Sequence, residues 1–361
     1  MKNILLLSLL TCSQIIFSQQ LNLVTGLNDT INETSGLLLI NGKLITHNDS
    51  GTSSDLYEID SITGSITRTV HISNAQNVDW EDITSDENYI YIGDFGNNTG
   101  TRTDLKVYRI SKNDFLNTVN DTVIADTILF SYAQQTDFTS ATFATNFDAE
   151  AMISLEDSLY IFSKNWGNAR SYVYALPKIP GTYSLSITDS LETQGFVTGA
   201  DYDAASNSIV LVGYTFTSSF LFQMSGFSGS SFSSGDMNRY NLALPNGYSY
   251  QTEGICFQSN NYLYISSETG QGGTTGLYSL AFNSFVGYQL LENDEILVYP
   301  NPVSNKITIK GEFDHVELYD SLGHRMLTTT KNHFSVRKFP SGNYSLYIYG
   351  NQLSIKKISI Q

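Results

Sequence analysis

The feature that most constrains the fold of this chain is a repeated pair of short strands with an acidic residue before the first strand. Its clearest copy is residues 79–83 (DWEDI), followed by residues 89–94 (YIYIGD). Weaker copies start near Thr34, Asp148, Thr198 and Thr252, at intervals of roughly 47 to 68 residues. Short strands that recur at such a period are typical of the blades of a β-propeller.

The five copies predict five blades, which divide into short strands separated by turn signals such as Asn41-Gly42 and Thr63-Gly64. The predicted strands are residues 36–40, 43–47, 56–60 and 66–72; 82–85, 89–93, 105–110 and 123–132; 150–155, 158–163, 172–176 and 182–189; 200–203, 208–214, 219–224 and a piece near 239–244; and 254–258, 262–266 and 276–282. The fifth blade lacks a strand, and residues 21–27 (LNLVTGL) are expected to supply it and so leave no open edge. A six-bladed ring is the alternative, because the long interval from Glu81 to Glu150 has room for further strands.

Composition agrees with an all-β protein. Only 15% of the residues are charged, whereas the chain has 23 Tyr and 20 Phe, which favour strands. No segment shows convincing helical periodicity. With 35 acidic and 19 basic residues the net charge is −16, which argues against a nucleic-acid partner because such partners need a basic surface.

The two ends of the chain differ from the repeats. Residues 1–18 are predicted to be a secretory signal peptide, since a lysine precedes a short apolar run, and no other run is long enough for a transmembrane helix. The propeller is assigned to residues 19–288 and an acidic linker to 289–295. Residues 296–361 alternate apolar and polar side chains between turn signals, which predicts a small β-sandwich.

The acidic residues of the repeats predict a metal site at one rim of the propeller. The first strand of a blade lies nearest the axis, so its start and the end of the antiparallel second strand emerge on the same face. The first set comprises Ser35, Glu81, Glu150, Gly199 and Glu253, and the second comprises Asn48, Asp94, Asn165, Thr215 and Glu268. Converging carboxylates suit a hard cation such as Ca²⁺, so Glu81, Glu150, Glu253, Asp94 and Glu268 are the candidate ligands. In the alternative interpretation, each acid only caps its own turn.

Two further groups are candidates on the same rim. His47 is a weak candidate for a general base, because it lies beside Asp49 and Ser50 on a rim loop. Aromatic side chains near the acids would either stack on sugars or aromatic ligands, or pack between blades; they are Trp80, Phe95, Trp166, Tyr214 and Phe216.

The blade-entry segments Glu81-Asp82-Ile83, Glu150-Ala151-Met152 and Glu253-Gly254-Ile255 resemble those of calcium-dependent propellers of the gluconolactonase and paraoxonase type. They also resemble secreted propellers of the SdiA-regulated and esterase-like phytase kind. The resemblance implies a bound Ca²⁺ and, as one possibility, hydrolysis of a phosphoester or lactone.

The C-terminal module resembles the type A sorting domain of the type IX secretion system of Bacteroidetes. The residues that carry this resemblance are 299–302 (YPNP), Leu322-Gly323, 340–344 (PSGNY) and Lys356-Lys357. It implies that residues 296–361 engage the secretion machinery, and that the protein passes through the periplasm to the outer cell surface or the medium.

The sequence thus favours an exported propeller that acts as a binding or scaffold module for an extracellular ligand, with a calcium-dependent hydrolase as the alternative. Whether it is an enzyme at all stays open at this point, because a fold alone does not determine function.

We predict that deleting residues 296–361 leaves a folded propeller that stays in the periplasm, because the segment read by the secretion machinery is gone. Immunoblots of periplasmic and extracellular fractions test this prediction. Normal amounts of the truncated protein outside the cell would contradict it.

Overall fold

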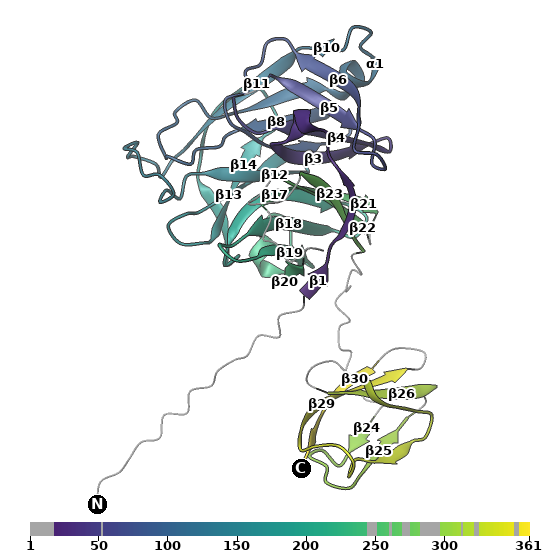
Figure 1. The fold of residues 1–361 in the computed structure, drawn as a ribbon. Helices are drawn as coiled ribbons and strands as arrows, with labels where there is room; N and C mark the ends of the chain where they lie inside the picture. Colours follow the sequence, from purple (N-terminus) through teal and green to yellow (C-terminus); the bar gives the residue numbers. More distant parts are fainter. Residues whose placement is uncertain are drawn as a thin grey trace, which may run out of the picture. The chain divides into compact units, whose positions relative to one another are not determined.

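The computed structural model describes residues 18–51, 53–243, 251–259, 262–268, 275–281, 297–311, 313–320, 325–349 and 354–361. The chain forms two units, Met1–Asn283 and Ser284–Gln361, each with a hydrophobic core of its own (Figure 1). The predicted linker, the Leu322-Gly323 turn and residues 1–17 of the predicted signal peptide lie outside the described residues. No helix in the described ranges is long and apolar enough to cross a membrane.

The described residues of unit 1 form five sheets, each built from four antiparallel strands that follow one another outward from the centre. Blade 1 has β3 (Thr34–Ile40), β4 (Lys43–Asn48), β5 (Asp55–Ile59) and β6 (Ile66–Ile72). Blade 2 has β7 (Trp80–Ser85), β8 (Tyr89–Asp94), β9 (Lys106–Ser111) and β11 (Ala125–Tyr132). Blade 3 has β12 (Ala149–Leu155), β13 (Ser158–Ser163), β14 (Ser171–Pro177) and β16 (Ile187–Leu191). Blade 4 has β17 (Phe196–Asp203), β18 (Ser208–Tyr214), β19 (Ser219–Ser225) and β20 (Asp236–Ala243). Blade 5 has β21 (Thr252–Ser259), β22 (Tyr262–Ser267), β23 (Gly276–Ala281) and β2 (Asn22–Gly26).

The innermost strands form a ring in the order β3, β7, β12, β17 and β21, and β21 returns to lie beside β3. The unit is therefore a five-bladed propeller, as predicted. The six-bladed alternative is wrong, because the long interval between Glu81 and Glu150 contains the outer strands of blade 2 and a loop without strands.

The ring is closed by the N-terminal segment. Strand β2 pairs antiparallel with β23, with Leu23 opposite Tyr278, so residues 21–27 supply the missing strand as predicted. Leu21 and Leu27 are buried beside this strand. The first and last parts of the propeller thus share one sheet (Figure 1).

Three short strands extend the outer edges of blades through parallel pairing. They are β1 (Ser18–Gln20) on β20, β10 (Thr122–Val123) on β6, and β15 (Gly181–Leu185) on β11. The sequence predicted residues 182–189 as one strand, which is wrong: β15 joins blade 2, whereas β16 stays in blade 3. Extra edge strands of this kind cover backbone groups that would otherwise be open to pairing.

Within the ranges that the structure describes, helical structure is confined to short segments. A helix that periodicity did not predict, α1 (Lys112–Asn117), starts at Ser111, whose hydroxyl accepts a hydrogen bond from the Asp114 N–H. The 3₁₀ turns are η1 (Asp29–Ile31) and η2 (Phe232–Ser234).

Separate apolar clusters fill each of the interfaces between neighbouring blades. Polar anchors lie closer to the axis. Asp82 is fully buried on β7, and its carboxylate accepts hydrogen bonds from the N–H groups of Ile83 (2.8 Å), Met152 (2.7 Å) and Ala200 (3.2 Å). One side chain therefore links the inner strands of blades 2, 3 and 4. Asp201 links blade 4 to blade 5 in the same way, through the Phe257 N–H.

Unit 2 is a small β-sandwich, as predicted. One sheet comprises β24 (Leu297–Tyr299), β25 (Lys306–Lys310) and β28 (His333–Ser335), and the other comprises β26 (His315–Tyr319), β27 (Arg325–Thr329), β29 (Gly342–Tyr349) and β30 (Ser354–Ile360). Ile307 and Ile309 of the first sheet pack with Leu318, Leu346 and Ile358 of the second.

We predict that Asp82→Ala lowers the free energy of unfolding by about 3 kcal/mol or more, because each buried N–H left without a partner costs about 1–3 kcal/mol. Urea denaturation measures this change. Asp126→Ala is the control, since Asp126 forms an exposed ion pair with Arg109 and its loss should change stability little. Equal effects of the two substitutions would contradict the role given to Asp82.

Candidate cation-binding cavity at the channel mouth

A β-bulge at the same place in every blade positions the first ring of site residues. The pairing register between first and second strands shifts at Trp80/Asp82, Ala149/Ala151, Val197/Gly199, Thr34/Leu37 and Thr252/Ile255. The residues left unpaired include Ser35, Glu81, Glu150, Thr198 and Glu253. A bulge redirects the side chain of the extra residue, and here it directs the three glutamates and Ser35 into one cavity.

Blade 4 departs from the prediction, because its bulge residue is Thr198 rather than Gly199. The Thr198 hydroxyl donates a 2.5 Å hydrogen bond to the Thr252 carbonyl of the next blade, and Ser35 donates in the same way to the Glu81 carbonyl. Gly199 is needed for a different reason: a Cβ at that position would overlap the carbonyl oxygen of Glu253.

The second ring comes from the second strands: in each blade it is the residue that follows the partner of the residue just before the bulge. These residues are Asp49, Phe95, Lys164, Tyr214 and Glu268, and all of them except Phe95 line the cavity. The sequence analysis placed Asn48, Asp94, Asn165 and Thr215 here, one residue out of register. A one-residue slip in a strand moves a side chain to the opposite face, so only Glu268 was placed in the right register.

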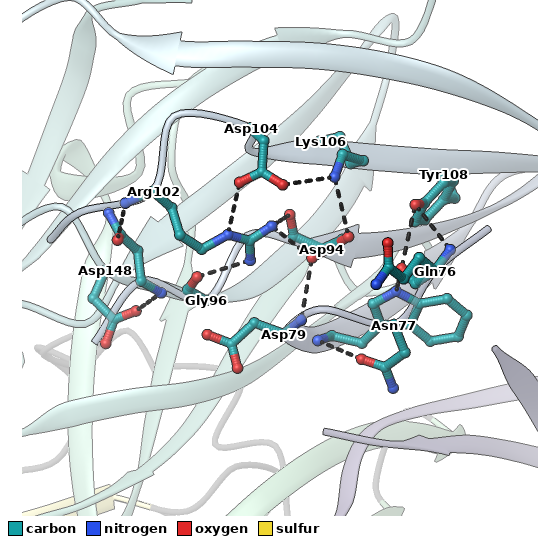
Figure 2. Close-up of polar contacts among 12 residues, drawn as sticks. Gln76, Asn77, Asp79, Asp94, Gly96, Arg102, Asp104, Lys106, Tyr108 and Asp148 are labelled. Carbon is teal, nitrogen blue, oxygen red and sulfur yellow. Dashed lines mark hydrogen bonds and ion pairs between the residues drawn. The ribbon is translucent and has the colours of Figure 1, made fainter. Parts of the chain in front are cut away.

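Asp94 consequently lies outside the cavity. Its carboxylate lies 2.8 Å from the Arg102 guanidinium and 3.4 Å from the Lys106 ammonium. Figure 2 shows both contacts. It also accepts a 3.2 Å hydrogen bond from the backbone N–H of Asp79. Asp94 is therefore neutralised by protein cations and positions the loop that carries Asp79.

The cavity has a volume of about 150 Å³ and is lined almost entirely by polar and aromatic side chains. Besides the two rings, Asn98, Phe143, Trp166 and Gln251 contribute to its wall. Glu81, Glu150, Glu253 and Glu268, which are four of the five predicted metal ligands, are thus gathered around one space.

The densest group of carboxylates in this region is one that the sequence analysis did not identify. Oxygen atoms of Asp49, Asp79 and Glu81 lie within 4.8 Å of one another. Glu81 is only 4% exposed, and its carboxylate has no hydrogen-bond or ion-pair partner among the described residues. Burial, reinforced by neighbouring carboxylates, raises the pKa of Asp49 to about 8 and that of Asp79 to about 6.

Gly96 makes room for this group. A Cβ at position 96 would overlap a carboxylate oxygen of Glu81 and another of Asp79. Any larger residue would therefore fill the space into which both carboxylates point.

Blade 3 carries its own counter-ion. The Lys164 ammonium lies 2.6 Å from the Glu150 carboxylate, and both side chains are buried. The same ammonium lies over the rings of Trp166 (4.9 Å) and Tyr214 (5.1 Å). Because of this pair, Glu150 is not available as a free ligand. Sequence reasoning missed Lys164, although it is the one basic residue among the five second-ring positions.

The other candidates lie elsewhere. His47 is fully buried with its ring edge-on to Trp80 (centroid distance 5.6 Å), and burial lowers its pKa to about 4. Trp80 and Phe95 belong to the cores between blades, whereas Phe216 is 86% exposed. The cavity wall described here contains no histidine.

Comparison with known proteins identifies the C-terminal unit. Residues 297–361 match the family described as secretion system C-terminal sorting domain. The protein is therefore cargo of the type IX secretion system, exported to the cell surface or secreted, and it carries a five-bladed propeller as its passenger domain.

No curated protein matches the sequence. Similar solved structures include the PQQ-bound aldose sugar dehydrogenase from Streptomyces coelicolor, with 11% identity, TM-score 0.45, and coverage of 72% of this chain and 97% of that one. A quinonprotein alcohol dehydrogenase-like protein from Bacteroides thetaiotaomicron has 10% identity, TM-score 0.33, and coverage of 92% and 67%. BamB from Moraxella catarrhalis has 10% identity, TM-score 0.25, and coverage of 91% and 83%. At such values these likenesses say nothing about ligand or activity.

We predict that Lys164→Met destabilises the propeller by about 3 kcal/mol, because it leaves the buried Glu150 carboxylate without its cation. The double variant Lys164→Met/Glu150→Gln should recover most of that loss, since no charge then stays unpaired. Urea denaturation of the two single variants and the double variant gives the coupling energy. Additive effects would contradict the pairing.

Proposed function

We propose that the propeller is an exported binding module that holds Ca²⁺ at the mouth of its channel through Asp49, Asp79 and Glu81. The observation that carries this proposal is the group of three carboxylates within 4.8 Å, one of them buried and without a partner. Buried carboxylates that accept no hydrogen bonds are stable only when a cation or a proton compensates them.

The donor set favours a hard ion. All three side chains offer oxygen, and neither nitrogen nor sulfur ligands accompany them. Ca²⁺ takes 6–8 oxygen ligands in a flexible geometry, so waters or a ligand's own oxygens would complete its coordination. An ion held in this way would act as a bridge between the propeller and an extracellular ligand.

The proposed ligand set differs from the one that the sequence predicted. Glu150 is paired with Lys164, and Asp94 is paired with Arg102 and Lys106. Glu81 is the member of the predicted set that lies with two further acids. Glu253 and Glu268 line the same cavity from blade 5.

Calcium-dependent hydrolysis of a phosphoester or lactone is the second candidate function. Lys164 favours it, because an ammonium in the cavity wall would stabilise negative charge that develops on a substrate oxygen. Binding is preferred, since the Ser35 hydroxyl is already donated to a backbone carbonyl and no histidine lies on the described wall. Release of product from a phosphoester or lactone by the calcium-loaded protein would favour hydrolysis instead.

We predict that Ca²⁺ raises the melting temperature of the protein, because an ion that binds only the folded state stabilises it by about 2.7 kcal/mol at a hundredfold excess over Kd. Asp79→Asn should weaken calcium binding at least about tenfold, as one charged ligand is lost. Asp126→Asn removes the same charge from an exposed site and should leave binding unchanged. Thermal melts and calorimetric titrations with calcium and with chelator measure both effects.

Two results would overturn this assignment. A wild-type melting curve that ignores both calcium and chelator would remove the metal proposal. Normal calcium affinity in Asp79→Asn, together with a large loss in Glu253→Gln, would place the ion on the ring of glutamates instead.

A further inference from the structure

Blades 3 and 5 present residues at the same two positions to the cavity, but only blade 3 has a basic residue at one of them. In blade 3 the bulge residue Glu150 faces the second-ring residue Lys164. In blade 5 the equivalent residues are Glu253 and Glu268, so two acids lie where the other blade has an acid and a base.

No cation is in hydrogen-bonding contact with the blade 5 pair in the described residues, although the charge of Lys164, which is paired with Glu150, acts on both carboxylates at longer range. Glu253 is only 6% exposed, and its carboxylate forms no hydrogen bond or ion pair with any described residue. Glu268 likewise has no such partner in the described part of the chain, and both side chains line the cavity. A buried carboxylate of this kind is costly unless it takes up a proton or a donor with positive charge reaches it.

The Lys164 side chain shows that this cavity accommodates an ammonium group. Lys164 places a primary ammonium against a bulge glutamate at 2.6 Å, with two aromatic rings around it. Aromatic surface is also available to a ligand, because Phe143 lines the cavity, is 61% exposed and packs on Trp166 at a centroid distance of 4.7 Å.

We propose that Glu253 and Glu268 form a subsite for the primary ammonium group of a ligand, whose alkyl chain lies against Phe143 and Trp166. The subsite deepens the proposed binding function and shares its cavity, but it uses different carboxylates from the calcium group. A cavity of about 150 Å³ has space for a few water molecules, which is enough for an aminoalkyl end and not for a folded domain. The ammonium group comes either from a free alkylamine or from a lysine side chain of a protein.

The experiment is a calorimetric titration of the full-length protein in the presence of chelator, so that calcium plays no part. The probes are n-butylamine and N-acetyl-lysine-N-methylamide, with N-acetyl-norleucine-N-methylamide as the partner that lacks the ammonium group. We expect at least one ammonium probe to bind and the norleucine compound to bind at least about tenfold more weakly, since a charge-assisted hydrogen bond is lost. Equal binding of both ammonium probes indicates a free amine as the source, whereas preference for the lysine compound indicates a protein side chain.

Variants locate the subsite. Glu253→Gln and Glu268→Gln should each weaken ammonium binding about tenfold, because each removes one charged acceptor. Asp126→Asn should leave it unchanged. Glu268 follows β22 and is less buried than Glu253, so its variant keeps the test valid if Glu253→Gln fails to fold.

The proposal is overturned if neither ammonium probe binds, if the norleucine compound binds equally well, or if both variants bind normally. Calcium binding is measured separately without any amine. Failure of one proposal is therefore distinguishable from failure of the other.

Discussion

The bulge in the innermost strand of every blade is the constraint on which the channel mouth depends. Without the extra residue, alternation along the strand would send Glu81, Glu150 and Glu253 into the packing between blades. With it, they point into one cavity while their neighbours, such as Asp82, keep contact with the next blade. Local backbone irregularity therefore separates the residues that hold the ring together from those that face a ligand.

Buried acids of this propeller fall into three groups, of which two are compensated by the protein itself. Asp82 and Asp201 accept backbone N–H groups of neighbouring blades, which turns their charge into inter-blade contacts. Asp94 and Glu150 are paired with Arg102 and Lys164. Glu81 and Glu253 have neither kind of partner in the described residues, and this difference distinguishes candidate ligand groups from structural ones. An acid-rich sequence motif does not show which acid has a partner in the protein. Glu81 and Asp82 are adjacent in the sequence, yet only Asp82 accepts hydrogen bonds from neighbouring blades.

Much of the fold could be predicted from the sequence because it depends on local patterns. Alternating residues and turn signals locate nearly all the strands, and the lone apolar segment 21–27 indicates ring closure. The division of residues 182–189 between two blades could not be predicted, because the pairing of an edge strand depends on tertiary contacts and not on the local sequence. The site was predicted only in part: the repeat places the glutamates, but a one-residue error in the second strands exchanges Asp94 for Phe95 and Asn165 for Lys164. Such residues can be placed correctly only when the pairing register of the strands is known, and the register depends on the positions of the bulges.

Ring closure by β2 also relates the completion of the propeller to the position of the sorting domain in the chain. Strand β2 pairs with β23, so the fifth blade needs residues from both ends of unit 1, and the sorting domain begins soon after β23. Contacts between residues far apart in the sequence, such as those of β2 with β23, form late in folding. Bringing the two segments together costs loop-closure entropy, and structure that has already formed must offset this cost. The propeller can therefore complete its last sheet only when nearly the whole unit is available, at about the point in the chain where the sorting domain follows. In the completed ring β2 covers the edge of β23, which would otherwise be open to pairing with a neighbouring strand.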